Sequence, residues 1–504
     1  MNDVTVSVSH GALRGRESGG VLAFLGIPYA APPFGRLRMR PPQPPASWGG
    51  LRDATVYGAS APQPGYGPAM AGLLEEAGPQ GEDCLNLNVW TPAAPGRAGE
   101  RLPVMVFVHG GAFRNGAGSL ALYDGSRLAA DGVVCVTLNY RLGAEGFLLL
   151  PDGTANLGLL DQIAALRWVR DNIAAFGGDP DNVTVFGQSA GAISVTALMT
   201  MPGARGLFRR AITQSGAGHH VHTPGIGRLI TERIAALAGV PCTRAALAAT
   251  PPDVLVAADT ALGQEIARSR EPRLWGESAG GGTTVLPVVD GVTLPSRPVD
   301  AIAAGAGTEV DLLTGTTSDE FRLFAVPMGI VHRMDDTVVK GFLTGIGLPA
   351  ERAHALYTLA AGPNATPGDV FSAVMTDHSY RIPAIRVAES RARHDAHTYV
   401  YEFARASTAA DGTLGACHMA ELPFVFGTLD TSPADRRPDA QDLSDQVRAA
   451  WVSFARDGRP TPPRGARAWR PYATDRTVLR IGAGTATEVH DPAAERRHLW
   501  EGRR

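Results

Sequence analysis

The spacing of apolar residues changes character near residue 85. Before it, Val4–Val8 alternates apolar and polar residues, and Leu22–Leu25 forms a second short apolar run after a glycine-rich bend. Alternation with a period of two residues, interrupted by turn residues, predicts the strands of a β meander. Residues 31–68 are rich in proline and glycine, which predicts a long ordered loop.

After residue 85 the pattern becomes that of an α/β fold. Nearly continuous apolar runs indicate strands buried on both faces, and they lie at residues 85–90, 103–110 and 133–140. An amphipathic helix is predicted over 158–176, where apolar residues recur at intervals of three and four. A strand over 182–186 and an apolar helix over 192–199 follow. This alternation predicts a large, mostly parallel central sheet flanked by helices.

Neither a linker nor an internal repeat divides the chain, although its 504 residues exceed the usual length of one domain. We therefore expect residues 1–504 to form a single domain. The excess length is expected to lie in insertions around the sheet.

Composition and charge exclude several classes of protein. Hydrophobic residues make up 44% and charged residues 19%, as in ordinary globular proteins. The formal net charge is −3 without clusters of one sign, which argues against binding to nucleic acid or to an acidic membrane surface. The longest apolar runs fall far short of the ~18 residues of a membrane span, and the first residues lack a signal-peptide pattern. We expect a cytoplasmic protein.

The four cysteines, Cys84, Cys135, Cys242 and Cys417, show neither a CxxC pair nor the spacing of a zinc site. The sequence therefore predicts no metal site, and it carries no motif for another cofactor.

Two pentapeptides fit the pattern G-x-S-x-G, at residues 187–191 and 276–280. In this pattern a strand enters a tight turn that exposes the serine, and a helix leaves it. Ser189 has a predicted strand before it and a predicted helix after it. Ser278 has neither, and a flexible Gly/Ser loop is the simpler interpretation of its segment. We therefore predict Ser189 as the nucleophile.

A second glycine-rich turn follows the predicted strand at 103–108. Gly110 and Gly111 lie in this turn, where their backbone N–H groups could face a developing negative charge together with the N–H of Ala190. The segment alone is equally consistent with a plain turn. Its position upstream of the serine turn favours an oxyanion hole.

These segments, with others spread along the chain, resemble the cholinesterase/carboxylesterase family, and most of all its bacterial type-B carboxylesterases. The matching stretches are residues 26–38, 81–92, 103–113, 138–147, 156–191, 214–217, 315–321, 415–427 and 451–463. The resemblance implies an α/β-hydrolase fold in which helical insertions wall an active-site gorge.

The resemblance also implies the partners of Ser189. The acid of the family maps onto Glu320 and the histidine onto His418. Asp319 and Asp311 lie nearby, and either one is an alternative acid; a further alternative is that all three are solvated loop carboxylates. The order of serine, acid and histidine along the chain is that of the α/β-hydrolase scaffold.

Among the other histidines, His219, His220 and His222 lie in a loop soon after the matching stretch 214–217. They could line the gorge, or they could be exposed loop residues.

The sequence departs from the family at Gln188, where glutamate is usual. Loss of that carboxylate lowers the negative potential beside the nucleophile, which argues against a quaternary-ammonium substrate. Further candidates for contacts with a substrate are Phe113, Trp275, Phe321 and Met419, although each could be an ordinary core residue.

The resemblance implies a serine carboxylic ester hydrolase that forms an acyl-enzyme with uncharged short- to medium-chain or aryl esters. We expect a monomer or a weak homodimer. One alternative is a hydrolase that prefers amide, carbamate or lactone bonds. A remote alternative is a non-catalytic adhesion or scaffold module, since the family includes such proteins.

Overall fold

The predicted apolar runs form the centre of one sheet in the computed structural model, which describes residues 3–93, 101–269, 271–280, 282–431, 435, 437–482 and 485–503. Within these residues thirteen strands pair in the order β1-β2-β3-β5-β7-β6-β8-β9-β10-β11-β12-β13, with β4 beside β2. The strands are β1 (Asp3–Val8), β2 (Gly11–Ser18), β3 (Val21–Pro28), β4 (Leu51–Asp53), β5 (Asn86–Pro92), β6 (Leu102–Val108), β7 (Val134–Leu138), β8 (Gly178–Gln188), β9 (Arg210–Gln214), β10 (Asp311–Thr317), β11 (Thr398–Phe403), β12 (Thr477–Ile481) and β13 (Thr487–His490).

The sheet is parallel from β7 to β12 and antiparallel at its two ends, except that the short β4 pairs parallel with β2. The predicted parallel centre and the N-terminal meander are thus confirmed. Strand β5 is antiparallel to both of its neighbours although it is buried on both faces. Burial of a strand on both faces therefore does not determine its direction.

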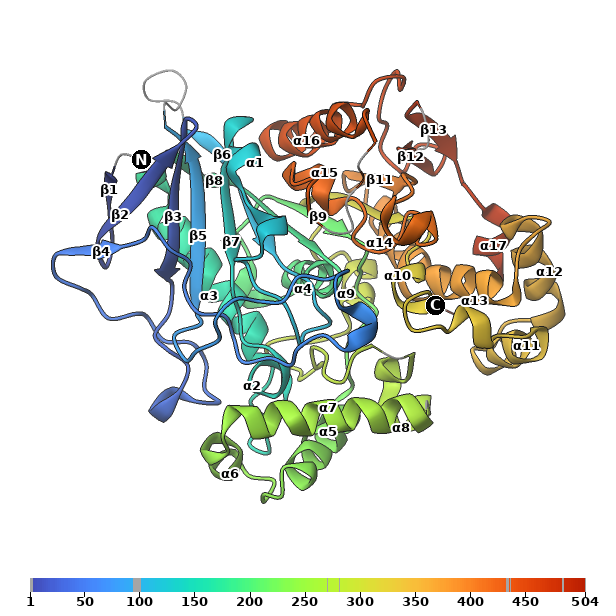
Figure 1. Cartoon of the computed structure of the whole chain (residues 1–504), viewed down its shortest axis with the longest axis horizontal. Helices are drawn as coiled ribbons and strands as arrows, with labels where there is room; N and C mark the ends of the chain where they lie inside the picture. Colours follow the sequence, from blue (N-terminus) through green and yellow to red (C-terminus); the bar gives the residue numbers. More distant parts are fainter. Residues whose placement is uncertain are drawn as a thin grey trace.

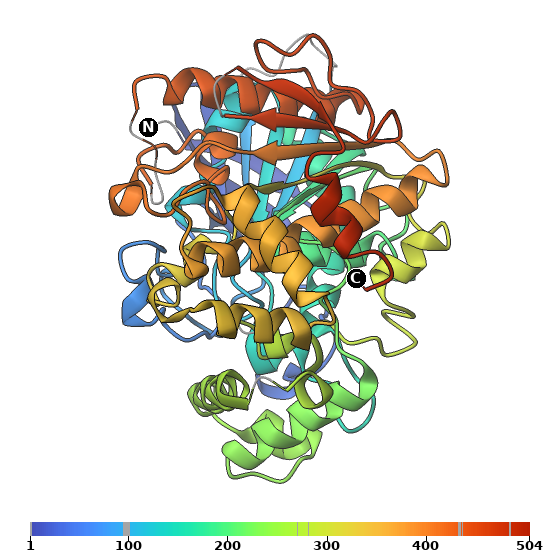
Figure 2. The same ribbon diagram turned by 90° about the vertical axis from the view of Figure 1, so that its right-hand side faces the viewer.

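Helices cover both faces of the sheet (Figures 1 and 2). They are α1 (Ser126–Ala130), α2 (Gly143–Phe147), α3 (Leu157–Asn172), α4 (Ala190–Leu198), α5 (Pro224–Leu237), α6 (Arg244–Ala249), α7 (Pro252–Ser269), α8 (Pro272–Trp275), α9 (Pro298–Ala303), α10 (Arg322–Ala325), α11 (Asp336–Gly345), α12 (Ala350–Ala361), α13 (Pro367–Thr376), α14 (Ile382–Ala392), α15 (Leu422–Phe426), α16 (Ala440–Asp457) and α17 (Ala494–Leu499).

Successive side chains of the central strand β6 point to opposite faces of the sheet and pack in two separate apolar cores. Val106 packs in the core that contains α3 and α4, whereas Phe107 belongs to the core that contains α15 and α16. The rings of Phe107 and Phe426 lie 5.0 Å apart. Because both faces of the sheet are covered, its middle strands are held rigidly, which suits a support for reactive groups.

Two helical insertions account for much of the length. Helices α5–α8 lie between β9 and β10 in the sequence, below the sheet in Figure 1, and α11–α13 lie to its right. The second insertion has its own apolar cluster, which includes Tyr357, Phe371 and Trp500. Among the helices within the described residues, none has both the length and the hydropathy that crossing a membrane requires.

Candidate active site

The carboxyl ends of β8, β10 and β11 bring three predicted site residues to one edge of the sheet. Ser189 follows β8 directly, Glu320 lies three residues after the end of β10, and His418 lies between β11 and α15. Neighbouring parallel strands end on the same side of a sheet, which is where ligands bind in α/β folds.

The backbone at Ser189 is strained. Its φ is +57° and its ψ is −124°, a region that residues with a side chain rarely adopt. The Ser189 N–H donates to the carbonyl of Gln214 at 2.9 Å, and the Ser189 carbonyl accepts from the N–H of Ile193 at 2.9 Å. These bonds hold a sharp strand-to-helix turn that leaves Ser189 partly exposed.

The glycines that flank Ser189 allow this turn to pack closely. A methyl group on Gly187 would lie 2.6 Å from the carbonyl carbon of Gly191. A methyl group on Gly191 would overlap the carbonyl oxygen of Val108. The pattern G-x-S-x-G therefore has a steric cause here.

Glu320 and His418 form a close, buried pair. Glu320 Oε2 lies 2.5 Å from His418 Nδ1, and Glu320 Oε1 accepts from the N–H of Thr317 at 2.8 Å. The carboxyl group of Glu320 is fully buried and the His418 ring nearly so. A carboxylate accepts hydrogen bonds only, so Nδ1 carries a proton and the lone pair of the neutral ring lies on Nε2.

The two alternative acids have other partners. Asp319 Oδ2 accepts from the N–H of Ala416 at 3.0 Å. Asp311 lies 3.3 Å from His397 and 3.6 Å from Arg210. Of the three carboxylates, the described residues show only Glu320 in contact with the ring of His418.

Gln188 occupies the other side of the His418 ring, a contact that sequence reasoning missed. Its amide nitrogen Nε2 lies 3.0 Å from His418 Nε2, and both side chains are buried. A methyl group on Gly110 would lie 2.9 Å from Gln188 Oε1. The amide of Gln188 therefore lies between the glycine turn after β6 and the histidine.

Two aromatic rings beside His418 also escaped sequence reasoning. Tyr380 lies 4.8 Å from the His418 ring between centroids, and Phe324 lies 5.5 Å from it. Tyr380 lies in a π-helical turn, Asp377–Arg381, between α13 and α14. Turns of this type are frequent at functional sites, but no residue pattern in the sequence marks this one.

Glu421 is a second buried carboxyl group near Glu320. Burial, then the charge of Glu320, raises the pKa of Glu421 from 4.5 to about 8. Its Oε1 accepts from the side-chain amide of Gln214 at 3.1 Å, while its Oε2 has no partner among the described residues. Glu421 is therefore largely protonated at neutral pH.

Three backbone N–H groups at the serine turn and at the turn after β6 have no acceptor among the described residues, and they belong to Gly110, Gly111 and Ala190. Gly111 has a φ of +109°, and a methyl group on it would overlap the carbonyl of Asn115. The neighbouring ring of His109 stacks on Tyr140 at 4.5 Å. Burial lowers the pKa of His109 to about 4, so it is a neutral packing residue.

The structure divides the four apolar candidates for substrate contacts into two groups. Phe113 is fully buried with its ring 4.6 Å from that of Phe147, and Trp275 is 6% exposed with its indole N–H donating to Ser269. Met419 follows His418, with a φ of +72°. Phe321 packs 5.7 Å from Phe324, whose ring faces His418. Phe321 and Met419 thus lie near the histidine, whereas Phe113 and Trp275 belong to the core.

Ser278 has a different environment from Ser189. It lies in a short 3-10 helix, Gly276–Gly280, and is fully buried rather than in an open loop. Its Oγ lies 3.3 Å from His222 Nε2 and donates to the Thr284 carbonyl at 3.3 Å. Burial lowers the pKa of His222 to about 4. This serine–histidine contact is closed to solvent and has no strand leading into it.

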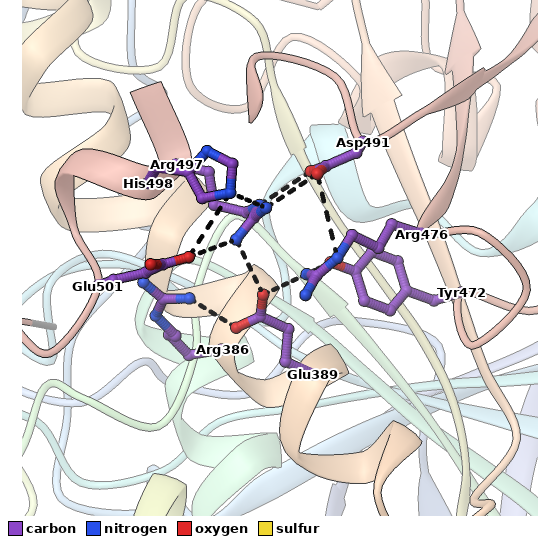
Figure 3. Close-up of polar contacts among 8 residues, drawn as sticks. All are labelled: Arg386, Glu389, Tyr472, Arg476, Asp491, Arg497, His498 and Glu501. Atoms are coloured by element: carbon purple, nitrogen blue, oxygen red, sulfur yellow. Dashed lines mark hydrogen bonds and ion pairs between the residues drawn. The ribbon is translucent and has the colours of Figure 1, made fainter. Parts of the chain in front are cut away.

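A surface cavity of about 650 Å³ lies away from these residues, between α14 and the C-terminal segment. Glu389 there contacts three arginines, at 2.6 Å for Arg386, at 3.6 Å for Arg497 and in a short ion pair with Arg476 (Figure 3). Asp491 binds Arg497 through both carboxylate oxygens, each at 2.8 Å.

Three arginines in Figure 3 therefore face three carboxylates, with Glu501 as the third. Arg393 also lines the cavity. The network connects α17 and the end of the sheet to α14. Among the described residues, no three His, Cys, Asp or Glu side chains form a group that could hold a metal ion.

Comparisons with known proteins cover nearly the whole chain. The family model described as Carboxylesterase family matches residues 2–500. A para-nitrobenzyl esterase of Bacillus subtilis is 38% identical over 99% of this chain and 98% of its own length. A phenmedipham hydrolase of Pseudarthrobacter oxydans is 36% identical over 97% of this chain and 98% of its own length. A crystal structure of a Geobacillus stearothermophilus carboxylesterase has a TM-score of 0.85 at 36% identity, covering 98% of this chain and 99% of that one.

Proposed function

The chain belongs to the carboxylesterase family and has its α/β-hydrolase fold, and we propose that it hydrolyses uncharged carboxylic esters through an acyl-enzyme on Ser189. The observation that carries this proposal is the 2.5 Å contact between Glu320 Oε2 and His418 Nδ1, beside the strained turn at Ser189. It supplies a base with a defined tautomer beside the turn that carries the partly exposed Ser189.

In the first step His418 Nε2 accepts the proton of the Ser189 hydroxyl while Oγ bonds to the ester carbonyl carbon. Glu320 keeps the proton on Nδ1 and stabilises the imidazolium that forms. Because Glu320 is buried and bonded to the N–H of Thr317, its carboxylate is fixed in position for this task.

The negative charge that develops on the carbonyl oxygen is stabilised by the backbone N–H groups of Gly110, Gly111 and Ala190. Such donors are held in place before the reaction, so they stabilise the charge without reorganisation. Removal of one donor of this kind costs about 10²–10³ in rate.

Collapse of the tetrahedral intermediate breaks the bond to the alcohol, which takes the proton from His418. Water then adds to the acyl group as His418 takes its proton, the bond to Ser189 Oγ breaks as His418 passes that proton to Oγ, and the acid is released. Each proton in this sequence moves through a residue of this chain or the attacking water.

The substrate we propose is a neutral ester with an aromatic group. Gln188 places an uncharged amide beside the histidine, and the rings of Tyr380 and Phe324 flank it. The similarity to a para-nitrobenzyl esterase supports an aromatic alcohol, and the similarity to a phenmedipham hydrolase favours carbamate esters as a second class.

The domain organisation, the cellular location and the oligomeric state of the protein are further predictions. A single domain is supported by one sheet that contains strands from both halves of the chain. A cytoplasmic location is supported by the four cysteines, which are free thiols. For the oligomeric state, we propose a monomer or weak homodimer.

The test is hydrolysis of p-nitrophenyl esters of increasing acyl length by the native protein, Ser189→Ala and Ser278→Ala. We expect Ser189→Ala to lose activity by about 10⁵-fold or more and Ser278→Ala to retain it. Loss of turnover in Ser278→Ala alone would refute the proposal. An aryl carbamate assayed with the same variants tests the second class.

A further inference from the structure

The contact between Gln188 and His418 joins two nitrogen atoms at 3.0 Å. An amide nitrogen is a donor only, so this contact is attractive only if His418 Nε2 accepts. Nδ1 of the same ring must donate to Glu320, so the proton of the neutral ring lies on Nδ1 and Nε2 is free to accept. The neutral ring therefore presents a lone pair to Gln188.

The protonated ring would reverse this relationship. An imidazolium carries a proton on both nitrogens, and its Nε2–H would face the N–H of the amide. Gln188 could meet it only by rotating its amide to present Oε1. A glutamate at the same position accepts hydrogen bonds in either orientation and would attract the imidazolium.

We propose that Gln188 is a positioning residue that holds His418 in its neutral, proton-accepting form in the free protein and releases it to Ser189 when an ester binds. This inference rests on the proposed function and deepens it. Among the described residues the Ser189 hydroxyl has no hydrogen bond to His418, whereas Gln188 does.

The two residues compete because Nε2 has one lone pair. For the reaction to begin, the N–H···N bond from Gln188 must break, and Nε2 then receives the proton of Ser189 Oγ as Oγ bonds to the substrate. No proton passes through Gln188. The amide is therefore a resting partner of the base.

Among the described residues Gln188 is the hydrogen-bond partner of Nε2, while Glu320 on the other side of the ring favours the imidazolium. Glu320 faces Nδ1, and the ring of Tyr380 lies 4.8 Å away. Burial is the main cause that raises the pKa of both Tyr380 and Cys417, which stay neutral. Glu421, whose pKa burial raises to about 8, is largely neutral at pH 7.

The experiment measures kcat and KM for a neutral p-nitrophenyl ester from pH 5 to 9 with the native protein, Gln188→Glu and Gln188→Met. For Gln188→Glu we expect the acid limb of kcat/KM to move to higher pH by about one unit or more. Activity near pH 6 then falls about tenfold, while the values at pH 9 stay within about threefold.

Gln188→Met keeps the length of the side chain and removes the competing donor. Its plateau kcat/KM is expected to rise by about two- to tenfold, the effect of losing one amide hydrogen bond that opposes the reaction. The acid limb of this variant is expected to move to higher pH by about 0.3–1 unit, because the lost bond stabilised only the neutral ring.

The matched control is Gln264→Glu, which adds the same charge on the exposed side of α7, four residues before Arg268. Its pH profile should superimpose on the native one. Circular dichroism and the Tm establish that each variant is folded.

A Gln188→Glu profile that superimposes on the native profile, or a shift that Gln264→Glu reproduces, would overturn the inference. If Gln188→Glu does not fold, the plateau of kcat/KM of Gln188→Met tests the inference instead. A plateau equal to or lower than that of the native protein would overturn the inference. Different results would refute the proposed function itself: no esterase activity in the native protein, or esterase activity retained in Ser189→Ala.

Discussion

Gly191 lies so close to Val108 that the carbonyl oxygen of Val108 occupies the place of a side chain on Gly191. Helix α4 therefore leaves the serine turn in direct contact with the end of β6. Backbone atoms cannot move aside as a flexible side chain can.

Gly191→Ala is expected to displace α4 and the turn at Ser189. A shift of about 1 Å at a reacting group lowers the rate by about 10²-fold, so we expect at least this loss of kcat/KM and a lower Tm. The control is Gly341→Ala, at an exposed helical position with open space around it, which should raise stability by about 0.5–1 kcal/mol. Activity in Gly191→Ala close to the native value would contradict the steric explanation.

The identity of the acid is tested by Glu320→Gln beside Asp319→Asn. Glutamine keeps the shape of Glu320 but loses the charge that fixes the proton on Nδ1, and we expect kcat to fall by about 10⁴-fold. Asp319 accepts from the N–H of Ala416 and has no contact with the His418 ring in the described structure, so Asp319→Asn should stay within about tenfold. The reverse order of losses, measured with the same ester, would assign the role to Asp319.

Glu421 makes the stability of the folded protein depend on pH. Burial, then the charge of Glu320, raises its pKa from 4.5 to about 8, so the folded protein binds more protons than the unfolded chain between these values. The stabilising contribution is fully present below about pH 4.5 and is lost as the pH rises to about 8.

Glu421→Gln keeps an acceptor for Gln214 and removes this loss. The Tm of the variant relative to the native protein should therefore rise between pH 5 and pH 8, by roughly 2 °C or more. Thermal unfolding at several pH values measures it. A difference that is constant with pH would show that Glu421 does not hold a proton in the folded protein.

The ion-pair network around Glu389 predicts an effect on stability without an effect on chemistry. Glu389→Gln leaves three arginines facing a neutral amide, and we expect a loss of about 1–3 kcal/mol with kcat unchanged. Glu351→Gln removes an exposed partner of Lys340 and should change stability by less than about 0.5 kcal/mol. Equal Tm values for the two variants would assign no stabilising role to the network.

The sequence alone predicted the features that depend on local pattern. The apolar runs at β6, β7 and β8 predicted buried strands because both faces of a central strand must be apolar. The predicted helix over 158–176 corresponds to α3 and the short 3-10 turn that follows it. Ser189 was separated from Ser278 because a strand, a glycine turn and a helix are contiguous in the chain.

The family resemblance, rather than any local pattern, named Glu320 and His418, which lie 131 and 229 residues beyond Ser189. No periodicity connects residues so far apart. Strand direction at β5 was likewise open, because burial does not encode the direction of pairing.

Only the tertiary structure decided what surrounds His418. Gln188, Tyr380 and Phe324 come from a strand end, a π-helical turn and a short helix, and they meet at one ring because these three segments converge at the carboxyl edge of the sheet. The sequence thus determined which segments form strands and helices and which serine lies in the sharp turn. The partners of each buried polar atom depend on how distant segments pack, and that information exists only in the folded chain.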